Sequence, residues 1–282
     1  MSRIDRRALF TSGAAAALMA ATGSSLSAAP LRGGALRLAV PRQGDFLHLV
    51  ARGALYHTLT EIAPDGVLRG ELASQWHSSP DARIWTFDLR AGVRFHNDQL
   101  MTADDVIASL MAHDLPVGVE VLEITALTDL QLKIELAASN PDFPYLLADP
   151  RLIIARAGRI DAPLSEACGT GCYKVEFFQE NRHFRASRVD NNFKDGQAGW
   201  ADQVEVIVIP DAKVRAEALR DGYVDISALP DPKGLIKRGD FRYLPSQQDM
   251  ALATHSGVGV PKVVGRRTAL DDGRIAERWW RV

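Results

Sequence analysis

Alternating apolar and polar residues predict strands at three places in this chain. Residues 35–40, 85–89 and 130–136 each alternate with a period of two. That period is typical of a strand with one buried face, because successive side chains point to opposite faces of a sheet. Residues 204–209 are apolar almost throughout, which predicts a fourth strand that is covered on both faces.

Helices are predicted between these strands, where capping residues precede apolar stripes. Thr102 can cap a helix with Asp105 at the third helical position, as in a capping box. The apolar stripe of this helix consists of Val106, Ile107, Leu110 and Met111. Asp211 begins a second helix that ends at Gly222, and its predicted inward residues are Val214, Ala218 and Leu219. Strands and helices mixed in this way predict an α/β or α+β fold, with a mixed sheet flanked by helices.

Composition excludes several classes of function and is compatible with the predicted fold. With 46% hydrophobic and 24% charged residues, the 282-residue chain is typical of globular proteins and unlike disordered or multi-span membrane chains. The formal net charge is -2 and no dense Lys/Arg tract occurs, so no nucleic-acid partner is expected. Two cysteines exclude a disulfide-dense scaffold and any four-cysteine zinc site.

Residues 1–29 have the pattern of an export signal. A basic start is followed by an apolar stretch that is too short to span a bilayer and by small residues, which predicts cleavage near Ala28 or Ala29. The pair Arg6-Arg7, with Phe10 three residues on, resembles a twin-arginine signal, and a Sec signal is the alternative. We therefore expect the mature protein in the periplasm.

Patterns that carry catalysis are missing from the sequence. It contains no Gly-x-Ser-x-Gly elbow, no phosphate-binding loop and no His-Glu-x-x-His zinc motif. His96 and Asp98 lie two residues apart, a spacing that fits a turn with backbone hydrogen bonds better than a metal site. We therefore predict a protein that is not an enzyme and that has no cofactor, no catalytic residue and no metal.

Cys168 and Cys172 enclose Gly169-Thr170-Gly171. In an oxidising periplasm they could form a short-loop disulfide, and the glycines would let the backbone bend enough. Spacing alone does not decide the geometry. Two free thiols, one of them packed as a small hydrophobic side chain, are the alternative.

Several segments resemble, in sequence order, the periplasmic solute-binding proteins of peptide ABC transporters, the dipeptide/oligopeptide-binding family 5. Residues 55–61 resemble the family's "YEGLTE", residues 71–76 its "LAESW", and residues 85–98 are similar to "YTFHLRPGVKFHDG". Residues 102–106 look like "TAEDV", and residues 140–149 also have the family's pattern. Residues 169–175 resemble "GTGPYKV" with Cys172 in place of proline, and residues 209–226 resemble "IPDxxxRxxALxxGEVDI". No single motif is specific for the family. The occurrence of these motifs in the family's order over most of the chain is specific for it.

The resemblance implies that the chain forms the first lobe of a periplasmic-binding-protein type II-like fold. It also implies which partners the protein binds. The protein would bind a peptide or another small solute without chemistry and would deliver it to ABC permease subunits in the inner membrane. Family members close two lobes on their ligand by a hinge. Here the expected second lobe does not follow residue 226, and the last residues resemble the family's C-terminus, which returns to the first lobe.

We therefore expect four parts in the chain. They are the signal at residues 1–29, solute-binding lobe I at 30–229, a linker at 230–249 that replaces the largely deleted lobe II, and a C-terminal segment at 250–282 that returns to lobe I. The pair Trp279-Trp280 is expected to anchor that segment to the lobe rather than to stack on ligand.

Candidate ligand contacts lie in the loop after the first strand. Gln43, Asp45 and Phe46 follow the carboxyl end of that strand, a position that suits a binding crevice. Asp45 could pair with the amino terminus of a peptide. A solvated loop without ligand contacts is the alternative for the same residues.

A second hypothesis follows from the expected loss of a lobe. The chain could be a single-lobe accessory or sensor protein that has lost transport and docks on a permease or receptor. The face left by the missing lobe could also support a homodimer if it is apolar. The sequence identifies neither the ligand nor the oligomeric state.

Overall fold

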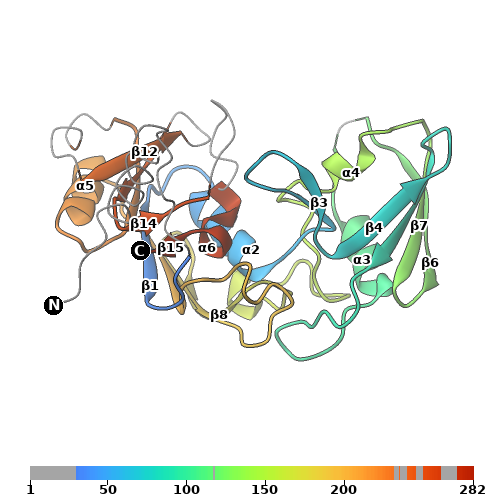
Figure 1. Cartoon of the computed structure of the whole chain (residues 1–282), viewed down its shortest axis with the longest axis horizontal. Coiled ribbons are helices and arrows are strands. Elements are labelled where there is room, and N and C mark those ends of the chain that lie inside the picture. The colour runs from blue at the N-terminus through green and yellow to red at the C-terminus, as the bar shows by residue number, and fades with distance from the viewer. Residues whose placement is uncertain (1–29, 117, 232–234, 236–239, 246–249, 262–271) are drawn as a thin grey trace, which may run out of the picture.

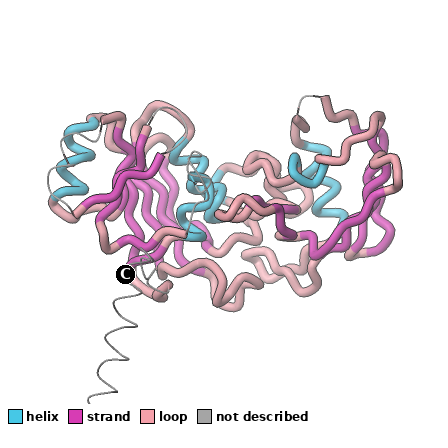
Figure 2. Tube along the Cα trace, turned by 45° about the horizontal axis from the view of Figure 1, so that its top comes forward, coloured by secondary structure: helices cyan, strands magenta, loops and turns pink. Residues whose placement is uncertain are grey.

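The structure is a computed structural model that describes residues 30–282 except 117, 232–234, 236–239, 246–249 and 262–271. The predicted signal, with Arg6 and Arg7, lies outside the described residues. Strands gather in two groups at opposite ends of an elongated molecule, with loops and helix α2 between them (Figure 1 and Figure 2). We call residues 30–57 and 173–282 the seven-stranded body, residues 58–150 the four-stranded body, and residues 151–172 the return segment.

The seven-stranded body contains the large mixed sheet, in the order β12-β13-β11-β1-β10-β9-β8. The strands of this sheet, in chain order, are β1 (Ala35–Val40), β8 (Tyr173–Gln179), β9 (His183–Arg188), β10 (Gln203–Val208), β11 (Ile226–Leu229), β12 (Phe241–Pro245) and β13 (Ala251–His255). The other elements of this body are α2 (Phe46–Leu55), α5 (Ala212–Arg220), β14 (Val258–Gly259), η3 (Asp272–Arg274), α6 (Ile275–Arg278) and β15 (Trp280–Arg281).

Strand β1 lies in the middle of this sheet and pairs in parallel with both β10 and β11. Helix α2 contacts β8, β9 and β10, while α5 contacts β1, β11 and β13. Because β1, β10 and β11 are parallel, their carboxyl ends lie at one edge of the sheet, which we call the carboxyl edge. The loop after β1 and the start of α2 therefore lie at that edge.

The four-stranded body is an antiparallel sheet in the order β4-β5-β7-β6, with its own core. Its elements are β2 (Thr60–Ile62), β3 (Leu68–Gly70), β4 (Ala73–Ser78), β5 (Ile84–Leu89), α3 (Ala103–Ala112), β6 (Val121–Thr128), β7 (Gln131–Leu136) and α4 (Phe143–Leu146). The return segment adds the short helix η1 (Leu164–Glu166). Phe87 and Phe143 pack edge to face in the core of this body. No helix among the described residues is long and apolar enough to cross a lipid bilayer.

The predicted strands β1, β5, β7 and β10 are confirmed, but two details of the sequence analysis are wrong. Met111 is 74% exposed, so it does not belong to the apolar stripe of α3. Val214 is 47% exposed, and the neighbouring Arg215 is buried in its place. The Arg215 guanidinium donates hydrogen bonds to the carbonyls of Ile209 and Ala228, which compensates for its burial.

Strand β10 is covered less completely than its apolar sequence predicts. Val204 and Val206 are fully buried on one face. Glu205, on the other face, lies 2.8 Å from the ring of His183 on β9, so that face is partly polar. The described part of the expected linker at 230–249 is also not irregular throughout, because residues 241–245 form β12 at the edge of the sheet, paired with β13.

The capping box of α3 gives a test of this architecture. The Asp105 carboxylate accepts hydrogen bonds from the Thr102 backbone at 2.9 Å and from the Ala157 backbone at 2.9 Å, so it ties the helix to the return segment. Asp105→Ala should therefore lower the free energy of unfolding by about 2–3 kcal/mol, the sum of a lost cap and an unsatisfied buried donor. Urea unfolding followed by circular dichroism measures this loss.

Asp104→Ala is the matched control, because Asp104 is exposed in the same helical turn. It should change the free energy of unfolding by no more than about 0.5 kcal/mol. Equal losses in the two variants would contradict the role given to Asp105.

Candidate functional site

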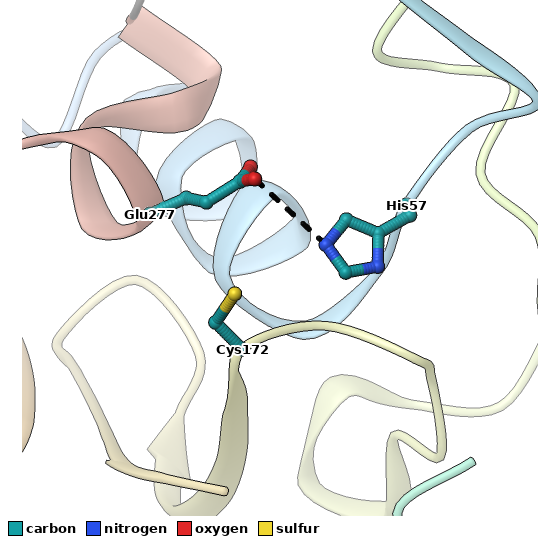
Figure 3. Close-up of side chains that lie close together, drawn as sticks. All are labelled: His57, Cys172 and Glu277. Carbon is teal, nitrogen blue, oxygen red and sulfur yellow. Dashed lines mark ion pairs between the residues drawn. The ribbon is translucent and has the colours of Figure 1, made fainter. Parts of the chain in front are cut away.

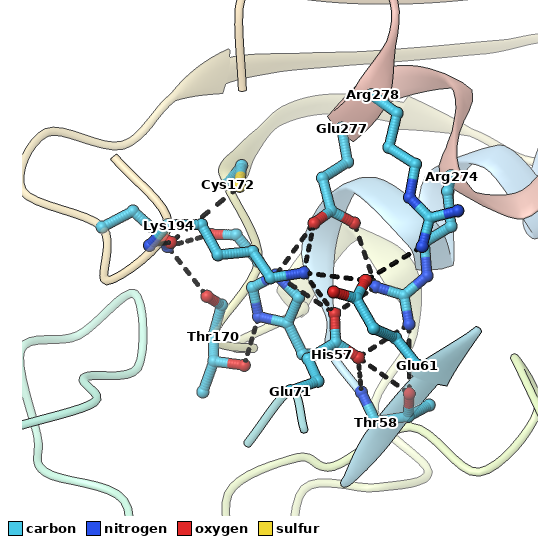
Figure 4. Close-up of polar contacts among 12 residues, drawn as sticks. His57, Thr58, Glu61, Glu71, Thr170, Cys172, Lys194, Arg274, Glu277 and Arg278 are labelled. Carbon is cyan, nitrogen blue, oxygen red and sulfur yellow. Dashed lines mark hydrogen bonds and ion pairs between the residues drawn. The ribbon is translucent and has the colours of Figure 1, made fainter. Parts of the chain in front are cut away.

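Charged side chains from four segments meet at the C-terminal end of α2, as Figure 4 shows. Glu61 and Glu71 come from the four-stranded body, Lys194 from the loop between β9 and β10, and the others from η3 and α6. We call this cluster the ion network, and it consists of Glu61, Glu71, Lys194, Arg274, Glu277 and Arg278. It joins the four-stranded body to two parts of the seven-stranded body, the loop before β10 and the C-terminal segment.

Two glycines allow the backbones to approach closely enough for this meeting. A Cβ atom at Gly53 in α2 would lie 1.2 Å from the carbonyl oxygen of Gly273, so η3 packs directly on the helix backbone. A Cβ atom at Gly171 would lie 2.2 Å from the carbonyl oxygen of Ala54. The Gly171 amide donates a hydrogen bond of 2.9 Å to the carbonyl of Leu55, which fixes the return segment at the end of α2.

Every carboxylate of the network faces a cation. The Lys194 ammonium donates to Glu71 at 2.6 Å, to Glu61 at 3.2 Å and also to Glu277. Arg274 binds both Glu71, at 2.7 Å, and Glu277, at 2.9 Å, and Arg278 binds Glu61 at 2.9 Å. Three carboxylates thus meet three cations, and the charges in the cluster balance.

The balance is visible in the pKa values. Burial alone would raise the pKa of Glu277, but the charges of Lys194 and Arg274 outweigh it and lower that pKa to about 2. Burial is likewise outweighed at Glu71, where Arg274 and Lys194 lower the pKa well below its ordinary value. For Lys194, burial acts to lower the pKa, and the neighbouring glutamates raise it instead. All of these groups therefore remain charged in the folded protein at neutral pH.

Two uncharged groups, His57 and Cys172, border the network (Figure 4), and both lie beside Glu277 (Figure 3). His57 Nδ1 shares a hydrogen bond of 3.0 Å with the Thr170 hydroxyl, and burial lowers the pKa of the ring to about 4. Its Nε2 has no hydrogen-bond partner among the described residues and lies 3.9 Å from Glu277 Oε1. Donor atoms of His57, Cys172 and Glu277 lie within 4.8 Å of one another.

Glu61, Glu71 and Glu277 form a second group with that spacing. All three of these carboxylates already bind cations of the network, which weakens their attraction for a metal ion, whereas in the first group only Glu277 does. A pocket of about 620 Å³, lined in part by Glu61, Lys194, Glu277, Trp200 and Trp280, opens onto the network. We call it the network pocket.

A second pocket, of about 490 Å³, lies between the two bodies beside the carboxyl edge. Helix α2 lines it with His48 and Arg52, which are four residues apart and therefore lie on one face of the helix, and Tyr56 follows directly after the helix. The end of α3, the return segment and the turn after β8 complete the wall, with His113, Asp114, Asp161, Phe178 and Glu180 among the lining residues. We call this the edge pocket.

Arg52 gives the edge pocket its chemical character. The His48 ring is paired with Glu180 at 2.7 Å, and Arg151 with Asp149 at 2.6 Å. Arg52, which is half-buried, has no ion pair or side-chain hydrogen bond among the described residues. A half-buried guanidinium without an anion favours a ligand that carries a carboxylate.

The three candidate ligand contacts after β1 differ from one another in their exposure. Gln43 and Asp45 are exposed at the carboxyl edge, and Asp45 lies one turn before His48, on the same side of α2. Phe46 is 1% exposed and belongs to the core of the seven-stranded body, so its side chain does not face a ligand. This corrects the sequence analysis, because the first apolar residue of α2 packs against the sheet rather than extending the loop.

Both cysteines are free thiols in the structure, so the disulfide that their spacing permits is not formed there. Cys172 is buried at the network, and Cys168 is half-buried against the core of the four-stranded body. The two terminal tryptophans are 1% and 5% exposed, which confirms that Trp279 and Trp280 anchor the C-terminal segment.

Residues 67–257 match the bacterial extracellular solute-binding proteins, family 5 Middle. The match covers more than half of the chain, so the chain belongs to this family. The predicted resemblance and the mixed fold are thereby confirmed.

Named relatives include binding proteins and a transcriptional regulator. The chain is 26% identical over 258 residues to a di/tripeptide-binding protein 2 of Pseudomonas aeruginosa, covering 78% of this chain and 47% of that protein. It is 32% identical over 162 residues to an HTH-type transcriptional regulator SgrR of Salmonella choleraesuis, covering 56% of this chain and 28% of the regulator. The chain thus spans about half the length, or less, of the curated relatives it matches.

Solved structures share the fold. A periplasmic binding protein AgaA of Agrobacterium tumefaciens in complex with agropinic acid has a TM-score of 0.67 and 24% identity, over 76% of this chain and 48% of that one. A periplasmic binding protein DppA of Helicobacter pylori with a bound peptide has a TM-score of 0.67 and 23% identity, over 77% and 51%.

His57 predicts a pH dependence of stability. Its folded pKa of about 4 is below the ordinary 6.5, so between these pH values the unfolded chain binds the proton and the folded chain does not. Stability from this group is therefore complete above pH 6.5 and is lost as the pH falls toward 4. Between pH 7 and pH 5 the loss amounts to about 2 kcal/mol.

Urea unfolding at the two pH values tests this effect. His57→Gln should show a drop in the free energy of unfolding that is smaller than that of the wild type by about 2 kcal/mol. His77→Gln, at an exposed position in β4, should behave like the wild type. A His57→Gln variant with the wild-type pH dependence would refute the assignment.

Proposed function

We propose that the protein is the periplasmic substrate-binding component of an ABC transporter for peptides or similar small solutes. It would bind its ligand without changing it chemically and would pass it to permease subunits in the inner membrane. The observation that carries the proposal is the edge pocket at the carboxyl edge of the large sheet, with Arg52, which has no ion pair within the described part of the chain. In open α/β sheets, ligands bind in the crevice outside the carboxyl ends of the strands.

The charges around the edge pocket suit a zwitterionic ligand. Arg52 would hold a carboxylate, and the exposed carboxylates Asp114 and Asp161 line the same pocket and could receive an amino group. Asp45, a turn away from the pocket, remains a candidate for the amino terminus of a longer peptide. A volume of about 490 Å³ lies within the range of small-molecule sites.

Relatives support this function by their names and ligands. One is named a di/tripeptide-binding protein, and two similar structures were solved with agropinic acid and with a peptide. All three names describe binding rather than catalysis. An exported, periplasmic location is part of the same proposal.

We propose a domain organisation with a single complete lobe together with this function. The described chain corresponds to lobe I of a two-lobed protein, and the short connection at 230–249 would stand in place of lobe II. A one-sided site encloses less of its ligand than a closed clamp does, so binding should be weaker than in a two-lobed relative.

A single-lobe accessory or sensor protein is the second candidate function. The observation that favours it is the similarity to the regulator SgrR, which shows that part of this chain resembles part of a transcriptional regulator. In this role the lobe would dock on a permease or receptor rather than deliver solute.

Calorimetric titration with di- to pentapeptides and with their C-terminal amides tests the proposed function. Wild-type protein should bind free peptides and should bind the amides about 10- to 100-fold more weakly, because the amides lack the carboxylate that Arg52 would hold. Arg52→Ala should weaken binding of the free peptides by a similar factor and should remove the difference between the two ligand forms.

Arg220→Ala is the matched control, because Arg220 occupies the last turn of α5 as Arg52 does in α2. It should bind peptides as the wild type does. If no peptide binds and the protein instead captures a purified permease or receptor domain, the sensor function is correct and the transport function is not.

A further inference from the structure

We propose that His57, Cys172 and Glu277 form a binding site for a borderline divalent metal ion, with Zn²⁺ as the expected ion. Figure 3 shows the three side chains directed at one another from three segments of the chain. Imidazole nitrogen, thiolate sulfur and carboxylate oxygen are the donors that Zn²⁺ takes in proteins.

His57 provides the independent evidence for a ligand. The side chain is 1% exposed, and its Nε2 has no hydrogen-bond partner among the described residues. A buried nitrogen without a partner is costly, and a metal ion would satisfy it. The hydrogen bond between Nδ1 and Thr170 orients the ring as the outer contacts of metal-binding histidines do.

Distances allow the site with small side-chain rotations. The three donor atoms lie within 4.8 Å of one another, and His57 Nε2 is 3.9 Å from Glu277 Oε1. Metal–ligand bonds of about 2.0–2.3 Å in a tetrahedral site place donor atoms about 3.5 Å apart. The fourth position could be taken by water from the network pocket, which Glu277 lines.

Lys194 is the natural competitor for Glu277, and the network can compensate for its displacement. If one Glu277 oxygen turns to the metal, Lys194 keeps Glu71 and Glu61 as partners, and Glu277 keeps Arg274 through its other oxygen. Burial raises the pKa of the Cys172 thiol, so the thiol is protonated in the metal-free protein. Binding then exchanges one proton for one ion, because the sulfur–hydrogen bond breaks as the sulfur–metal bond forms.

Cys172 is also a departure in sequence. In the motif "GTGPYKV", which residues 169–175 resemble, proline stands at its position. Such a site would fix the C-terminal segment, through Glu277, to the end of α2.

Titration of the full exported chain, purified without a histidine tag, with Co²⁺ and then Zn²⁺ tests the site. The wild type should bind one Co²⁺ with a thiolate-to-cobalt charge-transfer band that Zn²⁺ abolishes. One proton should be released for each ion, so that the affinity rises about tenfold per pH unit below the thiol pKa. Cys172→Ser should lose the band and His57→Gln should bind at least tenfold more weakly, while the control Cys168→Ser should behave like the wild type.

X-ray absorption spectroscopy of the Zn²⁺-loaded wild type provides a second test. Its result does not depend on whether the variants fold. It should show one sulfur at about 2.3 Å together with nitrogen and oxygen ligands. A coordination shell without sulfur, a charge-transfer band that survives in Cys172→Ser, or no stoichiometric binding would overturn the proposal.

Discussion

The buried ion network is the constraint on which the rest of this structure depends. It takes one carboxylate pair from the four-stranded body, a lysine from the loop before β10 and three charged residues from the C-terminal segment. Removing one partner from a buried ion pair leaves an uncompensated charge and costs about 3–5 kcal/mol. The segments that carry these residues therefore cannot separate independently. By fixing the end of α2 against the four-stranded body, the network also holds together the two walls of the edge pocket.

Strands and helix caps of this fold could be predicted from the sequence because they depend on residues that are close together in the chain. The alternating strands β1, β5 and β7 have the predicted positions, and so do the caps Thr102 and Asp211. On α5, Leu219 is buried as predicted, but Val214 was predicted wrongly because a hydrophobic stripe does not reveal acceptors from other segments. Arg215 is buried there since carbonyls at the ends of β10 and β11 accept its hydrogen bonds.

The candidate site could be predicted only in part, because its contacts join distant parts of the chain. Glu71 and Arg274 are 203 residues apart, and neither residue signals the other in sequence. Gln43 and Asp45 are exposed at the carboxyl edge, and the ligand contacts predicted for them stay a prediction. Arg52 was missed because it is one polar residue on an amphipathic helix, and only the fold shows that it lacks an anion among the described residues.

If the ion network makes one cooperative unit of the two bodies, loss of the Glu71 charge in Glu71→Gln should let them unfold separately. Tryptophan fluorescence and circular dichroism should report a single urea transition for the wild type and for the exposed control Glu123→Gln. In Glu71→Gln, we expect the free energy of unfolding to fall by about 3–5 kcal/mol and the two bodies to unfold in separate transitions. A Glu71→Gln protein that unfolds in one transition with the midpoint of the control would contradict it.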